Sequence, residues 1–212
     1  MKQCVIFDMD GTLLDSSRGM TASVNYVRDQ LGLPPIDVAM LTYYINTPGE
    51  NLPLRFYGTQ EYDPHHRAIF KEHYMEHCAK ELRLYEGIVD VLEWLSSKVM
   101  MAVATNASDF FAQKMLESTN IDHYFQLVVG ANTLGVSKPD PAMIEHVIRE
   151  MGSHALHTVL IGDSEKDELA ALHAKTKFIY ASWGYGEYKA PSSIVCAKPE
   201  ELKRVLEKEL IL

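Results

Sequence analysis

Residues 5–16 read VIFDMDGTLLDS, and this stretch decides the fold. Its short apolar run ends in two carboxylates, Asp8 and Asp10, which lie one residue apart and precede a Gly11-Thr12 turn. A short apolar run bounded by turn residues predicts a strand buried on both faces, as in parallel sheets. Because ligands of open parallel sheets bind beyond the carboxyl ends of the strands, the two carboxylates indicate a ligand site.

Further short apolar runs predict a sheet that is mostly parallel, since helical patterns separate them. They are Val99 to Ala104, Leu127 to Val129, Thr158 to Ile161 and Phe178 to Tyr180, after a first strand at Cys4 to Phe7. Two predicted helices are Ile88 to Leu95, with one apolar face, and Pro141 to Met151, with Asp140 as a capping residue. We expect an α/β fold, a doubly wound parallel sheet of the Rossmann-like type.

The segment from residue 16 to residue 84 predicts helices and no strand. An apolar stripe at helical spacing begins at Met20 and stops before Gly32, and Asp63-Pro64 is a start signal for another helix. Tyr85-Glu86-Gly87 then returns the chain to the sheet. We predict a core domain of residues 1–15 and 85–212 and an inserted helical cap of residues 16–84.

The composition indicates which kinds of binding partner to expect. The 212 residues carry a formal net charge of −9 and no run of basic residues, which disfavours nucleic acid and acidic membranes as partners and favours small ligands. Cys4, Cys78 and Cys196 are too far apart for a metal or disulfide framework, so we expect buried, reduced thiols. We expect a cytoplasmic protein without a signal peptide or membrane span, and both a monomer and a homodimer stay open.

Polar residues also follow the other predicted strands. Thr105 and Asn106 come after one strand, Lys138 lies in a loop, and Asp163 and Asp167 follow another strand. Several carboxylates at one place repel each other unless a cation lies among them, and hard oxygen ligands favour Mg²⁺. A metal, an ammonium group, a hydroxyl and a nucleophilic carboxylate together suit phosphoryl transfer.

These motifs resemble those of the haloacid dehalogenase-like superfamily. DMDGTLLDS at residues 8–16, Thr105 at a strand end, Lys138 in SKPDP and GDSEKD at residues 162–167 occur in the order typical of that family. The four motifs span most of the predicted core and leave room for a helical cap after the first. The resemblance implies a phosphatase or phosphomutase that acts on a small phosphorylated metabolite, rather than a dehalogenase, because dehalogenases lack an acid at the position of Asp10.

The resemblance also implies roles for the acids. Asp8 attacks phosphorus to form an aspartyl-phosphate, while Asp10 protonates the leaving oxygen and then activates water. Asp163, Asp8 and the backbone carbonyl of Asp10 hold Mg²⁺, and Asp167 supports them from outside the coordination shell or through water.

The remaining roles concern the phosphate. Thr105, with Asn106, is expected to bind the oxygens of the transferred phosphate, and Lys138 to neutralise charge on Asp8 and the phosphoryl group. Without the family order, the hydroxyl of Thr105 would equally well close a turn. Asp15 we interpret as structural.

Within the superfamily the sequence is most similar to the phosphoglycolate phosphatase-like group, on Tyr85-Glu86-Gly87, Ala104-Thr105-Asn106 and the run from Trp183 to Gly186. Glu86 departs from the proline usual there. The stretch 45–51 has no basic residue for a substrate carboxylate, so Arg55 or Arg18 is our candidate.

Several alternatives stay open. A β-phosphoglucomutase-like mutase, a pyrophosphatase, a nucleotidase and a non-catalytic phosphate-binding relative share the core, and a receiver domain shares the acid cluster but not the insertion. His73 and His77 lie four residues apart, but without a third ligand we expect a solvated helix face. Trp183 and Tyr185 we expect to close the core.

Overall fold

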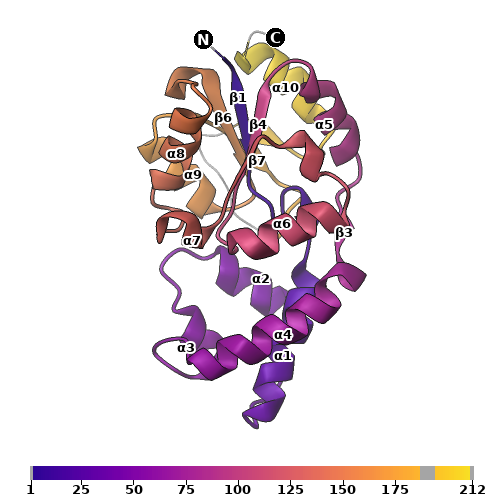
Figure 1. Ribbon diagram of the computed structural model, residues 1–212, viewed down its shortest axis with the longest axis vertical. Coiled ribbons are helices and arrows are strands. Elements are labelled where there is room, and N and C mark those ends of the chain that lie inside the picture. Colours follow the sequence, from indigo (N-terminus) through magenta and orange to yellow (C-terminus); the bar gives the residue numbers. More distant parts are fainter. Residues whose placement is uncertain (1, 187–193, 211–212) are drawn as a thin grey trace.

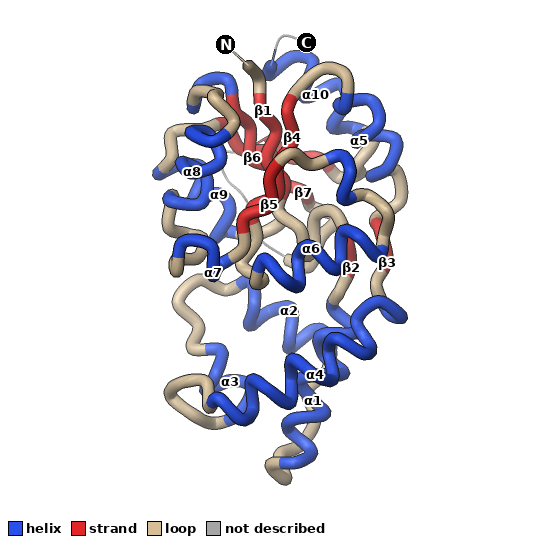
Figure 2. The backbone as a smooth tube through the Cα atoms, in the orientation of Figure 1, coloured by secondary structure: helices blue, strands red, loops and turns tan. Residues whose placement is uncertain are grey.

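A parallel sheet in the order β5-β4-β1-β6-β7-β8 forms the centre of the computed structural model, which describes residues 2–186 and 194–210 (Figures 1 and 2). Its strands are β1 (Cys4–Phe7), β4 (Met100–Ala104), β5 (Leu127–Val129), β6 (Thr158–Gly162), β7 (Lys177–Ala181) and β8 (Ile194–Cys196). All neighbouring strands pair in parallel. Strand β1 lies between β4 and β6, so the residues after it emerge at the middle of the sheet edge.

The alternation of side chains along β1 explains why this strand is apolar throughout. Cys4 and Ile6 pack into a cluster with helices α8 (Ala142–Glu150) and α9 (Glu165–His173). Val5 and Phe7 pack on the opposite face with α5 (Ile88–Ser96), α6 (Asp109–Ser118) and α10 (Glu201–Leu210). Figure 1 shows α8 and α9 on one side of the sheet and α5 and α10 on the other. Both faces are buried, as predicted for a doubly wound sheet.

Short elements complete the core. They are α7 (Ala131–Leu134) and two 3₁₀ helices, Asp122–Tyr124 and Ala155–His157. Helix α8 begins one residue later than predicted, and its N-cap residue is Pro141 rather than Asp140. Asp140, one residue before the N-cap, still accepts from the backbone N–H of Ala142 through Oδ1 at 2.8 Å. Of the described helices, none has the length and apolar character needed to cross a bilayer.

The helical cap lies at the carboxyl end of the sheet, on the side away from both termini (Figure 1). It contains α1 (Ser17–Gln30), α2 (Val38–Asn46), α3 (Leu52–Tyr57) and α4 (Pro64–Glu81). The stripe of α1 packs with residues of the other three helices around Val24, Val27 and Leu41. The prediction of an α/β fold with an inserted helical cap is therefore confirmed.

Three strands of the structure were not predicted. Leu14–Asp15 (β2) and Arg83–Leu84 (β3) pair as a short antiparallel ribbon where the cap joins the core, so the prediction of no strand in residues 16–84 is wrong at its end. The edge strand β8 was not predicted either. Runs of two or three residues carry no periodicity, and only pairing with a distant partner makes them strands.

Candidate active site

The loop after β1 brings Asp8 to the centre of the sheet edge. The backbone N–H of Asp8 donates to the carbonyl of Ile161 at 2.8 Å, which continues the pairing of β1 with β6. Gly11 then turns the chain with a φ of +85°, and a Cβ atom there would overlap with the carboxylate of Asp163. Glycine is therefore needed at residue 11 both for the backbone conformation and for the close approach of Asp163.

Three buried carboxylates gather beyond the strand ends. Asp8, Asp163 and Asp167 each offer an oxygen, and these oxygens lie within 4.8 Å of one another. Burial raises the pKa of Asp8 well above its usual range despite the charge of Lys138, and it raises the pKa of Asp163 to about 7. A cluster of hard oxygen donors that resists ionisation without a cation fits Mg²⁺, so the residues present suit the predicted metal.

Lys138 pairs with two of these carboxylates. Its Nζ lies 2.5 Å from Asp8 Oδ1 and 2.6 Å from Asp167 Oδ1, and it also donates to the carbonyl of Ala104 at 2.7 Å. Burial alone would lower the pKa of Lys138, but the charges of Asp167 and Asp8 outweigh it and the pKa is raised. The side chain is thus a fixed, buried ammonium beside the Asp8 carboxylate, which is the placement predicted for it.

Asn106 holds the Lys138 loop in place. Its Nδ2 donates to the carbonyl of Lys138 at 2.9 Å, and the N–H of Lys138 donates to its Oδ1 at 2.8 Å. Thr105 is buried, and its Oγ1 accepts from the N–H of Ala107 at 3.1 Å, which closes the turn after β4 and leaves the hydroxyl proton for a ligand. The contacts of Thr105 and Asn106 with phosphate stay predictions.

A tyrosine that we expected to close the core instead contacts Ser16, which bonds the second acid of the opening motif. Ser16 Oγ donates to Asp10 Oδ1, and Tyr185 OH lies 3.1 Å from Ser16 Oγ and accepts from the Ser16 N–H at 2.7 Å. Burial raises the pKa of Asp10 to about 6, and the bond from Ser16 opposes that shift. Ser16 therefore does not cap α1 with its side chain; it orients Asp10.

The segment of Tyr185 also touches the acid cluster. The Tyr185 N–H donates to Asp163 Oδ2 at 2.8 Å, and a side chain at Gly184 would overlap with Asp163. Trp183 behaves as predicted: it packs against the core, and its indole N–H donates to the carbonyl of Thr12 at 3.1 Å. In the sequence, only the resemblance in the run from Trp183 to Gly186 drew attention to this segment.

The end of α2 in the cap contacts the acid loop directly. Asn46 Nδ2 donates to Asp163 Oδ2 at 3.1 Å, and Lys166 Nζ donates to the carbonyl of Ile45 at 2.5 Å. Burial lowers the pKa of Lys166. Sequence reasoning missed Asn46 and Lys166 because neither residue belongs to a local pattern with its partner.

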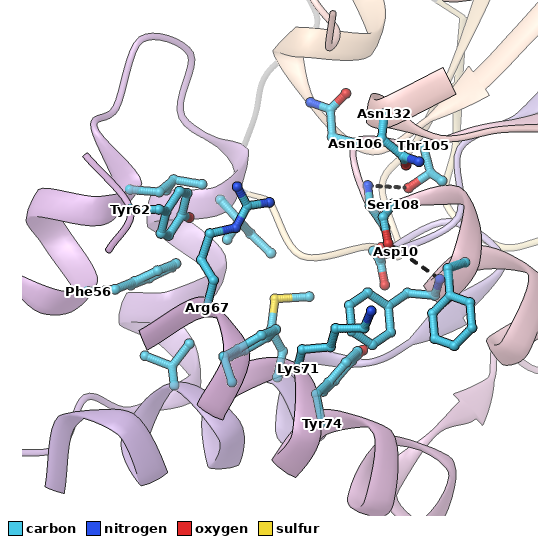
Figure 3. Close-up of a pocket in the computed structure, with 18 of the residues that line it drawn as sticks. Asp10, Phe56, Tyr62, Arg67, Lys71, Tyr74, Thr105, Asn106, Ser108 and Asn132 are labelled. Atoms are coloured by element: carbon cyan, nitrogen blue, oxygen red, sulfur yellow. Dashed lines mark hydrogen bonds between the residues drawn. The ribbon is translucent and has the colours of Figure 1, made fainter. Parts of the chain in front are cut away.

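A cavity of about 680 Å³ lies between the cap and the carboxyl ends of the strands (Figure 3). Asp8, Asp10, Thr105 and Lys138 are among the residues that line it. Asn106 and Asp167 also line it, so the structure brings most of the predicted site residues to one cavity; Asp163 lies behind them in the acid cluster.

Neither candidate for the basic residue of the cap lines this cavity. Arg55 is exposed and pairs with Glu50 at 2.7 Å, and Arg18 is exposed on α1. Instead, the cavity receives Arg67 and Lys71 from α4 and Lys166 from the core. The suggestion of Arg55 or Arg18 is therefore wrong for this cavity, because the cap presents a different helix to it.

The other residues weighed from the sequence have structural roles. Asp15 Oδ1 accepts from the Ser17 N–H at 3.0 Å and from its hydroxyl at 2.5 Å, as expected of a turn residue. His73 Nδ1 lies 2.9 Å from Ser23 Oγ and its ring stacks on Tyr26, so it packs against α1 and is only partly solvated. Cys4 and Cys196 are buried free thiols. The side chain of Cys78 is not among those that the structure describes.

Comparison with known proteins agrees with this geometry. A family model described as haloacid dehalogenase-like hydrolase matches residues 5–181. Phosphoglycolate phosphatase 1 of Pseudomonas aeruginosa is 32% identical over 87% of this chain and 71% of its own length, and the phosphoglycolate phosphatase of Aquifex aeolicus is 27% identical over 98% of both. A haloacid dehalogenase-like hydrolase of Streptococcus pneumoniae superposes with a TM-score of 0.81 at 26% identity, over 97% of this chain and 98% of its own.

Proposed function

The chain belongs to the haloacid dehalogenase-like hydrolase family, and within it we propose a Mg²⁺-dependent phosphatase that hydrolyses the phosphomonoester of a small molecule through an aspartyl-phosphate. One observation carries the proposal. Asp8 lies at the floor of a large cavity, its carboxylate 2.5 Å from the buried ammonium of Lys138, with Asp10 beside it in the same cavity. A nucleophile, a proton carrier and a fixed positive charge are the groups that this reaction needs.

The reaction has two steps. A carboxylate oxygen of Asp8 attacks phosphorus, the bond from phosphorus to the leaving oxygen breaks, and Asp10 gives its proton to that oxygen. Asp10 then takes a proton from water, whose oxygen attacks the aspartyl-phosphate and releases inorganic phosphate with Asp8 restored. A pKa of about 6 suits Asp10 to both directions of proton transfer near neutral pH.

The other residues stabilise charge. Lys138 neutralises Asp8 and the oxygens of the transferred group, and the hydroxyl of Thr105 donates to one of those oxygens. Asp8, Asp163 and the backbone carbonyl of Asp10 would hold Mg²⁺, with Asp167 supporting Lys138 and the cluster. When bound, the metal offsets negative charge that develops on the phosphoryl oxygens.

The relatives named phosphoglycolate phosphatase make 2-phosphoglycolate the first substrate to test. We place the reaction in the cytoplasm, on the acidic composition and the buried free thiols Cys4 and Cys196.

The test is phosphate release with Mg²⁺ from 2-phosphoglycolate, pyrophosphate, nucleotides and sugar phosphates. Asp8→Asn and Asp10→Asn should each lower turnover by about 10³-fold or more with an unchanged circular dichroism spectrum. Asp29→Asn, an exposed carboxylate on α1, is the control and should match the wild type. Full activity in Asp8→Asn would refute the mechanism.

A further inference from the structure

We propose, on the basis of the phosphatase function above, that the substrate is the phosphomonoester of a bulky, largely aromatic or apolar alcohol that carries a negative charge at its far end. The first observation is size. A cavity of about 680 Å³ is in the range that holds drug-sized ligands, whereas the leaving group of 2-phosphoglycolate is a two-carbon acid. Most of the cavity would stay filled with water above so small a substrate.

The second observation is the wall of the cavity, which is aromatic on both sides. Phe56, Tyr57 and Tyr62 line it from the cap, and Phe110 and Phe111 line it from α6 of the core. Phe110 is 44% exposed and Tyr62 is 38% exposed, so part of each ring is open to a ligand. Covering this apolar surface would stabilise the complex of a large apolar ligand, whereas a two-carbon acid is too small to cover it.

The third observation is a pair of cations on the cap side. Arg67 and Lys71 lie four residues apart on α4, which places them on one helix face, and Figure 3 shows both in the wall of the cavity. The Arg67 guanidinium lies 5.4 Å from the ring centre of Tyr62, and the Lys71 Nζ lies 5.0 Å from that of Phe110. Among the described residues, 2–186 and 194–210, no carboxylate lies within 4.0 Å of the charged group of Arg67 or Lys71.

The distribution of charge in the cavity indicates how the substrate would be oriented there. The acidic residues that line the cavity, Asp8, Asp10, Asp109 and Asp167, all come from the core. Among the described cap residues that line the cavity, none is acidic, so Arg67 and Lys71 leave that wall positive. With the phosphate at Asp8 and Lys138, the aromatic rings would enclose the body of the alcohol, and an anionic group at its far end would meet the two cations.

The experiment compares three substrates with Mg²⁺: 2-phosphoglycolate, phenyl phosphate and 4-carboxyphenyl phosphate. We expect kcat/KM to be at least tenfold higher for 4-carboxyphenyl phosphate than for 2-phosphoglycolate, and at least fivefold higher than for phenyl phosphate. In Arg67→Gln/Lys71→Gln the ratio between the two aryl phosphates should fall to about one. Lys80→Gln, an exposed lysine on the same helix, is the matched control and should keep the wild-type ratio.

A binding measurement separates this inference from the proposed function. Calorimetry on Asp8→Asn, which should bind without turnover, gives the Kd of each compound, and we expect the tightest binding for 4-carboxyphenyl phosphate. Phe110→Ala should weaken both aryl phosphates more than 2-phosphoglycolate.

Hydrolysis that favours 2-phosphoglycolate over both aryl phosphates would overturn the inference and leave the phosphatase in place. Absence of phosphate release from every compound would overturn the proposed function, and equal Kd values for the three compounds would overturn the pocket assignment as well.

Discussion

The amide of Asn46, the last residue of α2 in the cap, donates to Asp163 Oδ2 in the acid cluster of the core across 3.1 Å. The same oxygen accepts from the N–H of Tyr185 at 2.8 Å, so one face of the Asp163 carboxylate is fixed by two donors from different parts of the chain. The position of the cap is thus physically linked to the orientation of Asp163, a proposed metal ligand. Lys166, which donates to the carbonyl of Ile45, adds a second link at the same place.

Asn46→Ala should weaken Mg²⁺ binding by several-fold. A hydrogen bond to a charged group contributes about 1.5–3 kcal/mol, and the remaining bond from Tyr185 keeps part of the orientation. The measurement is the Mg²⁺ concentration that gives half-maximal thermal stabilisation, which does not depend on turnover. Thr47→Ala, the next residue, whose hydroxyl bonds only within the cap, is the control. Equal half-saturation in Asn46→Ala and wild type would contradict the link.

Lys138→Met should lower turnover by about 10³-fold and destabilise the fold at pH 7.5. Removing one partner of a buried ion pair costs about 3–5 kcal/mol, because the carboxylates of Asp8 and Asp167 are left uncompensated. Urea unfolding without metal measures the loss, which should shrink at pH 5, because burial raises the pKa of Asp8 and its carboxylate is protonated more easily there. Lys114→Met, which breaks an exposed pair with Glu117, should cost far less, because solvent screens that pair.

Tyr185→Phe should reduce kcat by about tenfold while the fold stays intact. The lost hydroxyl is the partner that holds Ser16, and Ser16 in turn orients Asp10. Steady-state kinetics against the best substrate of the panel provide the measurement, and we expect KM to change less than kcat. Tyr26→Phe, on an exposed tyrosine of α1, should behave as wild type. An unaltered kcat in Tyr185→Phe would show that Asp10 needs no support from this tyrosine.

The metal-free protein should lose stability as pH rises between about 4 and 7. Burial raises the pKa of Asp10 to about 6 and that of Asp163 to about 7, from an ordinary value of 3.8. The folded state therefore binds more protons than the unfolded state in this window, and the unfolding free energy falls as pH rises. Mg²⁺ binds the folded state, so its stabilisation should grow with pH over the same range.

The measurement is urea unfolding at pH 5 and pH 7.5, with a chelator and with Mg²⁺. We expect the metal-free protein to be less stable at pH 7.5 by a few kcal/mol, since each unit of pKa shift is about 1.4 kcal/mol. Asp163→Asn removes the contribution of one carboxyl group. In this variant the unfolding free energy of the metal-free protein should change less with pH. A metal-free wild type that is no less stable at pH 7.5 than at pH 5 would contradict this prediction.

Prediction of the fold succeeded where the sequence has a long-range period or a strong start signal. The strand at Cys4–Phe7 is apolar at every position because both of its faces are covered, and α4 begins after Asp63-Pro64 as expected. Helices α2 and α3 were not singled out, since they are short, although Asp37 and Asn51 do cap them. The β2–β3 ribbon has no local signal at all.

The sequence predicted the placement of residues at the carboxyl ends of strands, and their roles stay predictions. Asp8, Thr105 and Asp163 follow β1, β4 and β6, and neighbouring parallel strands bring such residues together whatever the rest of the chain does. Prediction failed for the cations of the cap: Arg55 is paired with Glu50, while Arg67 and Lys71 line the cavity. Which face of α4 meets the core depends on how the cap packs.

The sequence by itself determined five of the six strands of the described sheet, the order of the acidic and basic residues that follow them, and the presence of a helical insertion, because apolar periodicity and turn residues are local properties. Only the tertiary structure decided that Tyr185 and Ser16 orient Asp10, that Asn46 reaches Asp163 from the cap, and that Arg67 and Lys71 lie in an aromatic cavity. These contacts join residues as much as 169 positions apart, and packing of the cap against the core, which no local pattern encodes, brings most of them together.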